Sequence, residues 1–333
     1  MENEASALAK TLHKDPRVRK LLLDLVEEIE RKFTFSLREI AEKNGISYNK
    51  ASRIVERFSA DGSLRIRAVP RYPALGLEPI LVIANPKDGA WLDRAKRMLY
   101  LKCFGTVYGG GRRAALLIVP PPGTIEDNLG YIEREVGPVE EHFMLERELI
   151  SRPDLDLVEA EGVPWGRLRP VEIRKHVGRC AFDRVDLEAL AELEKSGLKR
   201  LTELSRILGV NRKTLEYRLR TRVKNLLEGF SLELRLWPRE LAPESLFVVK
   251  GAEQEEIATL STAPYPVRTL VGRDAAVVLI QLPCREKLGF LERISEIGEW
   301  KEYYLSGDWG VRSVPVEALV GKSAWTTRVS RAS

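Results

Sequence analysis

The stretch "LTELSRILGVNRKTLEYRLRTRV", Leu201–Val223, has the pattern of two short helices joined at Gly209. A similar stretch, "LREIAEKNGISYNKASRIVERF", occupies Leu37–Phe58, with Gly45 in the place of Gly209. The offset of 164 residues is close to half of the 333-residue chain. A helix-turn-helix that recurs at that distance predicts the duplication of a whole unit, so the residues that follow each copy should repeat as well.

Capping residues bound the helices of both copies. Ser36 followed by Glu39 has the pattern of a capping box, in which both side chains bond to the free amides of the first turn. Asp183 and Asn211 are the predicted N-caps of two helices in the second copy. Arg200 stands at the position that matches Ser36, so the second copy lacks the capping box.

The second helix of each copy is the candidate recognition helix, because that helix of a helix-turn-helix lies in the DNA major groove. In the second copy six residues from Arg212 to Lys224 are basic and one is acidic. The run after the first copy alternates apolar and basic residues, which predicts a strand, or wing, that offers arginines to phosphates. The predicted DNA-binding residues are Tyr48, Asn49, Lys50, Ser52 and Arg53, the wing residues Arg65, Arg67 and Arg71, and in the second copy Asn211, Arg212, Lys213, Tyr217, Arg220 and Lys224.

The distribution of charge follows the repeat. The chain carries a net charge of +5, divided as +4 over residues 1–72, −4 over 73–160, +6 over 161–240 and −1 over 241–333. Runs of charge are often only solvated faces, but an alternation in step with a repeat favours two nucleic-acid-binding regions.

Each helix-turn-helix is followed by segments in the order strand, helix, strand, strand, helix, strand. This order predicts an antiparallel sheet with two helices on one face. The predicted fold is therefore α+β, with two winged helix-turn-helix domains that are each followed by a ferredoxin-like βαββαβ domain. The expected boundaries are 1–72 and 73–150 for the first pair, 151–180 for a linker, 181–240 and 241–321 for the second pair, and 322–333 for a flexible tail.

These features together resemble the Lrp/AsnC, or feast/famine, transcriptional regulators of bacteria and archaea. The segment "FDRVDLEALAELEKSGLKRLTELSRILGVNRKTLEYRLRTRV" is similar to the three-helix opening of that family, and "TVYGGGRRAALLIV" and "TLVGRDAAVVLIQL" are similar to its central hairpin. The usual family member has one copy, whereas this chain has two in tandem. The resemblance implies a transcriptional regulator that binds double-stranded DNA. Two glutamines against 31% charged residues favour a thermophilic source. The resemblance implies an archaeal one.

The resemblance also implies an amino-acid-like effector that binds near the hairpin glycines. The candidate effector-binding residues are Gly109, Gly110, Gly272 and Asp274. In the first hairpin Arg112 and Arg113 stand where the family usually has an acidic residue. The alternative is that these glycines only permit the hairpin turns, which require positive φ.

The sequence shows no catalytic motif, and its three cysteines and three histidines are too far apart for a metal cluster. We therefore expect no catalytic residues, no cofactor and no enzyme activity. The alternatives to a regulator are an architectural DNA-binding protein with little sequence preference and a protein-interaction scaffold. No run of about 18 apolar residues occurs. We expect a cytoplasmic, nucleoid-associated protein that does not bind membranes.

The tandem copies predict how the chain assembles. Relatives with one copy pair their sheet domains between chains, so residues 80–150 and 246–306 should pack sheet against sheet as a pseudo-dimer within one chain. The two winged helices are expected to be set apart by the linker, and further homo-oligomers remain open. Because the two recognition helices differ in sequence, the DNA site should be asymmetric.

Overall fold

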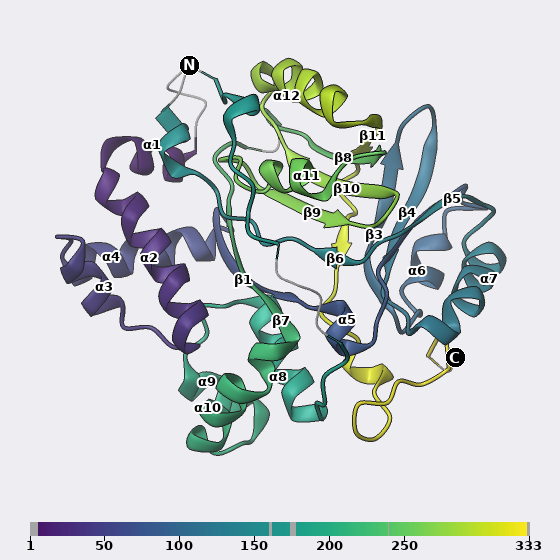
Figure 1. Cartoon of the computed structure of the whole chain (residues 1–333), viewed down its shortest axis with the longest axis horizontal. Coiled ribbons are helices and arrows are strands. Elements are labelled where there is room, and N and C mark those ends of the chain that lie inside the picture. Colours follow the sequence, from purple (N-terminus) through teal and green to yellow (C-terminus); the bar gives the residue numbers. More distant parts are fainter. Residues whose placement is uncertain (1–5, 160–161, 174–177, 239, 332–333) are drawn as a thin grey trace.

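The computed structural model describes residues 6–159, 162–173, 178–238 and 240–331 (Figure 1). Its elements repeat in the predicted order. The first helix-turn-helix consists of α1 (Ala7–Lys14), α2 (Pro16–Lys32), α3 (Leu37–Lys43) and α4 (Tyr48–Ala60), followed by the wing strand β1 (Leu64–Pro70) and the short helix α5 (Tyr72–Leu75). The second consists of α8 (Arg184–Lys195), α9 (Leu201–Leu208) and α10 (Arg212–Thr221), followed by the wing strand β7 (Leu227–Leu234).

Most of the predicted caps are present. Asn211 accepts a hydrogen bond from the Lys213 amide at 2.9 Å, and Asp183 and Asp186 form a reciprocal capping box at the start of α8. Ser36 accepts from the Glu39 amide at 3.4 Å, but the described residues show no return bond from the Glu39 side chain, so only half of the predicted capping box forms. Gly45 has a φ of +63°, a left-handed conformation that glycine adopts at little cost. These local interactions position both candidate recognition helices, α4 and α10.

The wings pair with each other. Strands β1 and β7 form a two-stranded antiparallel sheet in which Leu64 lies opposite Leu234 and Arg67 opposite Ser231. The helices of both units pack around this ribbon in one continuous hydrophobic core. The expectation that the linker sets the two winged helices apart is therefore wrong. The paired wings join the two helix-turn-helix units into one body.

Each half then contains a ferredoxin-like unit. The first consists of β2 (Ile80–Ala84), α6 (Trp91–Ala95), β3 (Leu101–Tyr108), β4 (Arg112–Ile118), α7 (Ile125–Glu135) and β5 (Val139–Met144). The second consists of β8 (Glu244–Lys250), α11 (Gln254–Leu260), β9 (Val267–Val271), β10 (Ala275–Gln281), α12 (Cys284–Ile297) and β11 (Glu299–Leu305). The strand orders β5-β2-β4-β3 and β11-β8-β10-β9 are those of the ferredoxin-like arrangement, so the predicted fold class is confirmed.

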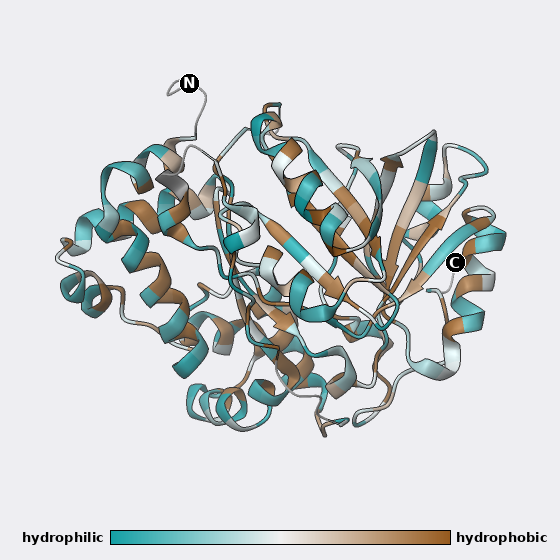
Figure 2. Ribbon diagram, turned by 45° about the horizontal axis from the view of Figure 1, so that its top comes forward, coloured by the Kyte–Doolittle hydropathy of each residue, from teal (hydrophilic) through white to brown (hydrophobic). Residues whose placement is uncertain are grey.

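The two sheets join into one ten-stranded sheet. Strand β3 pairs with β11, and the short strands β6 (Arg147–Glu148) and β12 (Gly310–Val311) cross from one half to pair with β9 and β3 of the other. The inner faces share one apolar core, which includes Leu81, Val107, Leu246 and Tyr303. Figure 2 shows mainly hydrophobic residues along these strands and polar residues on the outer faces of the helices. The two halves thus pack sheet against sheet within one chain.

The segments expected to be a linker and a flexible tail make specific contacts. Trp165 is buried beside α12, with its ring centroid 6.3 Å from that of Tyr265 and 5.1 Å from that of Phe290. Trp325 packs against Tyr100 and Phe182 and donates its indole N–H to the Leu75 carbonyl at 2.8 Å. The expectation that the tail frays is therefore wrong over the described residues 322–331, because this tryptophan anchors it.

Candidate nucleic-acid interface

Helix α10 exposes a basic face. Leu215 and Leu219 are fully buried and fix one side of the helix against its unit. Tyr217 is 66% exposed on the other side. Arg220 pairs with Glu216 of the same helix at 2.8 Å. Further exposed residues of the predicted set are Asn211, Arg212, Lys213 and Lys224, and the last three form no ion pair with any residue that the structure describes.

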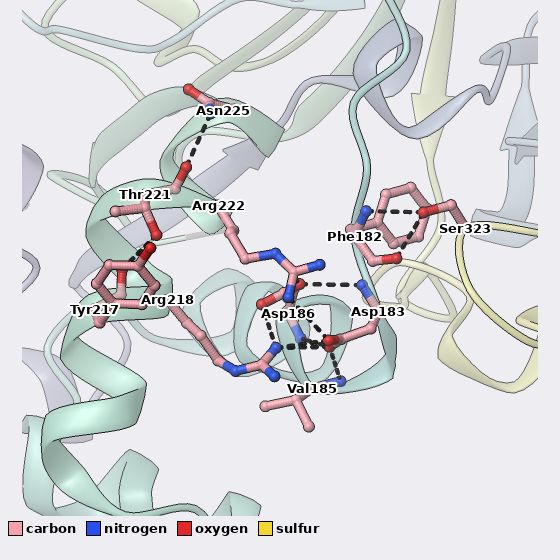
Figure 3. A network of polar contacts seen from close by, with 10 residues as sticks. All are labelled: Phe182, Asp183, Val185, Asp186, Tyr217, Arg218, Thr221, Arg222, Asn225 and Ser323. Atoms are coloured by element: carbon pink, nitrogen blue, oxygen red, sulfur yellow. Dashed lines mark hydrogen bonds and ion pairs between the residues drawn. The ribbon is translucent and has the colours of Figure 1, made fainter.

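Two arginines, Arg218 in α10 and Arg222 directly after its end, hold the helix against α8 (Figure 3). Arg218 contacts Asp183 at 2.7 Å and Asp186 at 3.0 Å, and Arg222 contacts the same two carboxylates at 3.0 and 3.2 Å. Partial burial would raise the pKa of Asp183, but the hydrogen bonds from Arg218 and from the Asp186 amide outweigh it and lower that pKa. Since these arginines are neutralised, they orient the helix and leave its outer cations for a ligand.

Helix α4 carries less available charge. Tyr48 is 38% exposed, and Asn49 and Arg53 are exposed beside it. Lys50 pairs with Asp15 at 2.7 Å, and the Ser52 hydroxyl donates to Glu56 at 2.6 Å. Hydrogen bonds from Arg17 and Lys50 hold the pKa of Asp15 far below its usual value. The first recognition helix is therefore mostly polar, as its sequence predicts, and the second is strongly basic.

The wing does not offer its arginines as predicted. Arg65 is exposed, but Arg67 and Arg71 are buried, with 4% and 8% of their surfaces accessible. Arg67 pairs with Glu148 and Glu233, and Arg71 contacts Glu228 at 3.5 Å. The prediction that Arg67 and Arg71 contact phosphates is wrong, because β1 is paired with β7 and both arginines are buried against carboxylates instead of lying on a free wing.

A cavity of about 720 Å³ lies at the turn between β9 and β10. This turn cavity is lined by charged residues of both signs and by Met144; the charged residues are Glu78, Glu146, Arg147, Arg273 and Asp274. Gly272 begins the turn, and a Cβ placed on it would lie 2.2 Å from the Met144 carbonyl oxygen. Of the four candidate effector residues, the structure places Asp274 in the lining of this cavity and Gly272 beside it.

The other hairpin, between β3 and β4, has different surroundings. Gly110 has a φ of +70°, and a Cβ on Gly109 would lie 2.7 Å from the Glu302 carbonyl oxygen. Tyr108 lies opposite Tyr304 across the β3–β11 junction, and the two are 50% and 46% exposed. Glycine is therefore required here by the turn and by close packing, which agrees with the purely structural alternative for Gly109 and Gly110.

The described residues contain no group of three or more histidine, cysteine, aspartate or glutamate side chains that could hold a metal ion; His176 lies outside them. None of the helices described is long and apolar enough to cross a membrane.

No protein-family model matches the sequence, and neither does any curated protein. Among solved structures, the siroheme decarboxylase NirDL is similar at 14% identity with a TM-score of 0.50, over 86% of this chain and 90% of that chain. PH0061 is similar at 14% identity and a TM-score of 0.28, over 38% of this chain and 88% of its own. An AsnC family transcriptional regulator from Agrobacterium tumefaciens is similar at 15% identity and a TM-score of 0.28, over 39% of this chain and 87% of its own.

The likeness to NirDL shows a shared fold and corrects one expectation. The absence of catalytic motifs led us to expect that the chain is no enzyme, and this is contradicted, because a siroheme decarboxylase has the same architecture over nearly its full length. Sequence motifs miss such a case because a fold can host unrelated functions whose sites carry no short signature. The chain thus has a two-unit fold that a decarboxylase shares.

Proposed function

We propose that the protein is a transcriptional regulator that binds double-stranded DNA with α10 and α4. The observation that carries the proposal is the exposed basic surface of α10 and of the turn that follows it. Arg212 and Lys213 on the helix and Lys224 in the turn have no described counter-ion, while Arg218 and Arg222 are neutralised. Cations presented in this way neutralise phosphates and release counter-ions, which supplies much of the free energy of DNA binding. Exposed Tyr217 and Asn49 supply groups that can contact base edges.

The difference between α4 and α10 determines the symmetry of the DNA site. Pairing of β1 with β7 fixes both helices in one body, as in a dimer, but their outer residues are unlike. A symmetric dimer selects a palindrome, whereas two unlike readers select two unlike half-sites. We expect an asymmetric operator.

The test is a selection from a random duplex pool, followed by fluorescence anisotropy over a series of salt concentrations. The triple variant Arg212→Ala, Lys213→Ala, Arg220→Ala should bind the selected duplex at least 100-fold more weakly, with a shallower salt dependence. Arg97→Ala is the matched control. It replaces an exposed arginine between α6 and β3 and should bind the duplex as the wild type does. Unchanged binding by the triple variant would exclude α10. A ratio of specific to nonspecific affinity below about 1,000 would favour the architectural alternative.

The turn cavity supports a small zwitterionic effector as part of this function. Arg147 and Arg273 provide cations for a carboxylate, and Glu78, Glu146 and Asp274 provide carboxylates for an ammonium group. Calorimetry with the free amino acids, on the wild type and on Asp274→Asn, tests this assignment. If an amino acid binds the wild type and binds Asp274→Asn more weakly, the effector site is supported. If no amino acid binds, the effector assignment is wrong.

A second candidate function is decarboxylation of a tetrapyrrole such as siroheme, because the fold is shared with NirDL over 86% of the chain. A substrate with many carboxylates requires an excess of cations in its binding site. The described lining of the turn cavity has three carboxylates and two arginines, so this cavity lacks that excess. Incubation of the protein with siroheme, followed by mass spectrometry of the tetrapyrrole, tests this second candidate. A mass loss of one or more CO₂ groups would favour this candidate.

A further inference from the structure

A second cavity lies between the two helix-turn-helix units. It has a volume of about 550 Å³ and is formed by residues from both halves of the chain. We call it the inter-unit groove; the residues that matter are Arg38, Tyr48, Ser52, Glu56, Leu198 and Arg200. The loop between α8 and α9 is held here because the Gly197 amide donates to the Ile66 carbonyl of β1 at 2.7 Å. In Figure 1 this loop lies beside the end of α2, between the regions of α4 and α10.

The groove carries positive charge from both units. Arg38 is exposed, with its guanidinium 5.5 Å from the centre of the Tyr48 ring, and Arg200 is an exposed lining residue from the other unit. Neither forms an ion pair with a residue in the described part of the chain. The carboxylate in the lining is Glu56, which accepts a hydrogen bond from Ser52. The described lining therefore has two arginines to one carboxylate.

The placement of Arg200 is locally unfavourable. It is the N-cap residue of α9 but makes no capping hydrogen bond, whereas Ser36 caps α3 at the matching position of the first unit. Replacing a capping serine by a residue that cannot cap costs about 0.5 to 2 kcal/mol, and a cation at a helix N-terminus opposes the helix dipole. Departures from local preference of this kind occur where a residue has another role. A bound anion in the groove provides such a role.

We propose that the inter-unit groove holds the DNA backbone between the two half-sites, with Arg38 and Arg200 contacting phosphates. The inference rests on the proposed function, since the wall formed by Tyr48 and Ser52 belongs to recognition helix α4 and makes the groove continuous with the proposed DNA surface. Phosphate contacts carry no sequence information but fix register. The groove therefore sets the spacing of the two half-sites.

The experiment uses the full chain and a fluorescein-labelled duplex selected by the wild type. Arg200→Ser installs the capping residue of the other unit, so its thermal midpoint should be equal to or above that of the wild type. The double variant Arg38→Ala, Arg200→Ser should bind roughly fivefold to twentyfold more weakly, and the slope of log K against log salt should fall by about 1.8 for two lost phosphate contacts. Arg97→Ala controls for the loss of a distant positive charge.

A second duplex separates the groove from other causes. It carries uncharged methylphosphonate linkages between the two footprinted half-sites. The wild type should bind it as weakly as the double variant binds normal DNA, and the double variant should lose no further affinity. An unchanged salt slope, or an equal loss of affinity by both proteins on the uncharged duplex, would overturn the groove assignment while DNA binding through α10 stands. If the wild type selects no duplex, both proposals fail.

Discussion

Arg67 of β1 and Glu148 of β6 form an ion pair that is buried between the paired wings and the ten-stranded sheet. Arg67 also contacts Glu233 of β7, and Glu148 accepts two hydrogen bonds from Arg268 of β9, at 3.0 and 3.1 Å. These four charges connect both wings to both halves of the sheet. The paired helix-turn-helix units and the ten-stranded sheet are therefore coupled through one buried polar network.

Glu148→Gln should destabilise the protein in a pH-dependent way. Burial would raise the pKa of Glu148, but Arg268 and Arg67 hold it well below its usual value of 4.5. A depressed carboxyl pKa contributes stability that is present above pH 4.5 and lost progressively as the pH falls below it. Urea unfolding at pH 7 should show a free energy of unfolding about 3 to 5 kcal/mol below that of the wild type. The reason is that the variant removes the negative charge that Arg67 and Arg268 share.

The same comparison at pH 3.5 should show a smaller loss. Glu299→Gln, at an exposed position of β11, is the control and should match the wild type at both pH values. An equal loss for Glu148→Gln at pH 7 and pH 3.5 would show that its charge does not stabilise the fold.

Asp183→Ala should lower stability by about 1 to 3 kcal/mol, because it removes an N-cap and the partner of Arg218 and Arg222 together. Asp183→Asn retains a capping side chain and loses only the charge, so thermal unfolding should place it between Asp183→Ala and the wild type. DNA affinity should follow the same order if this contact orients α10. Identical melting of the two variants would contradict the separation of cap and charge.

The two halves of the chain should not fold separately. Residues 1–159 alone would expose the apolar inner face of their sheet, together with β1 and the edge of β3 that pairs with β11. Exposed edges and apolar faces of this kind promote aggregation. Coexpression of residues 1–159 with residues 162–333 should recover a soluble complex of one copy of each, measured by light scattering. A monomeric, cooperatively folding single half would contradict the shared core.

Local signals in the sequence predicted the helices, several caps and the order of strands and helices along each half of the chain, because these depend on neighbouring residues. The surroundings of Arg67 depend on Glu148 and Glu233, which are 81 and 166 residues away. An alternation of apolar and basic residues describes a free wing and a buried ribbon equally well. The inter-unit groove was missed for the same reason, since Arg38 and Arg200 meet only when the two units pack together. The one sign of the groove in the sequence is Arg200, a residue that cannot cap its helix, at the position where the first copy has Ser36.

Gly272→Ala should disrupt the turn cavity. The added Cβ would lie 2.2 Å from the Met144 carbonyl oxygen and 3.1 Å from Leu145 Cα, both backbone atoms that cannot rotate away. The β9–β10 turn must therefore shift from the segment that crosses between β5 and β6, which moves Asp274 in the cavity lining. Overpacking of this kind costs about 1 to 3 kcal/mol. Gly123→Ala is the matched control, since a Cβ there meets nothing within 4 Å and φ is not positive. Thermal unfolding should therefore separate the two variants, and equal midpoints would mean that the turn yields without cost.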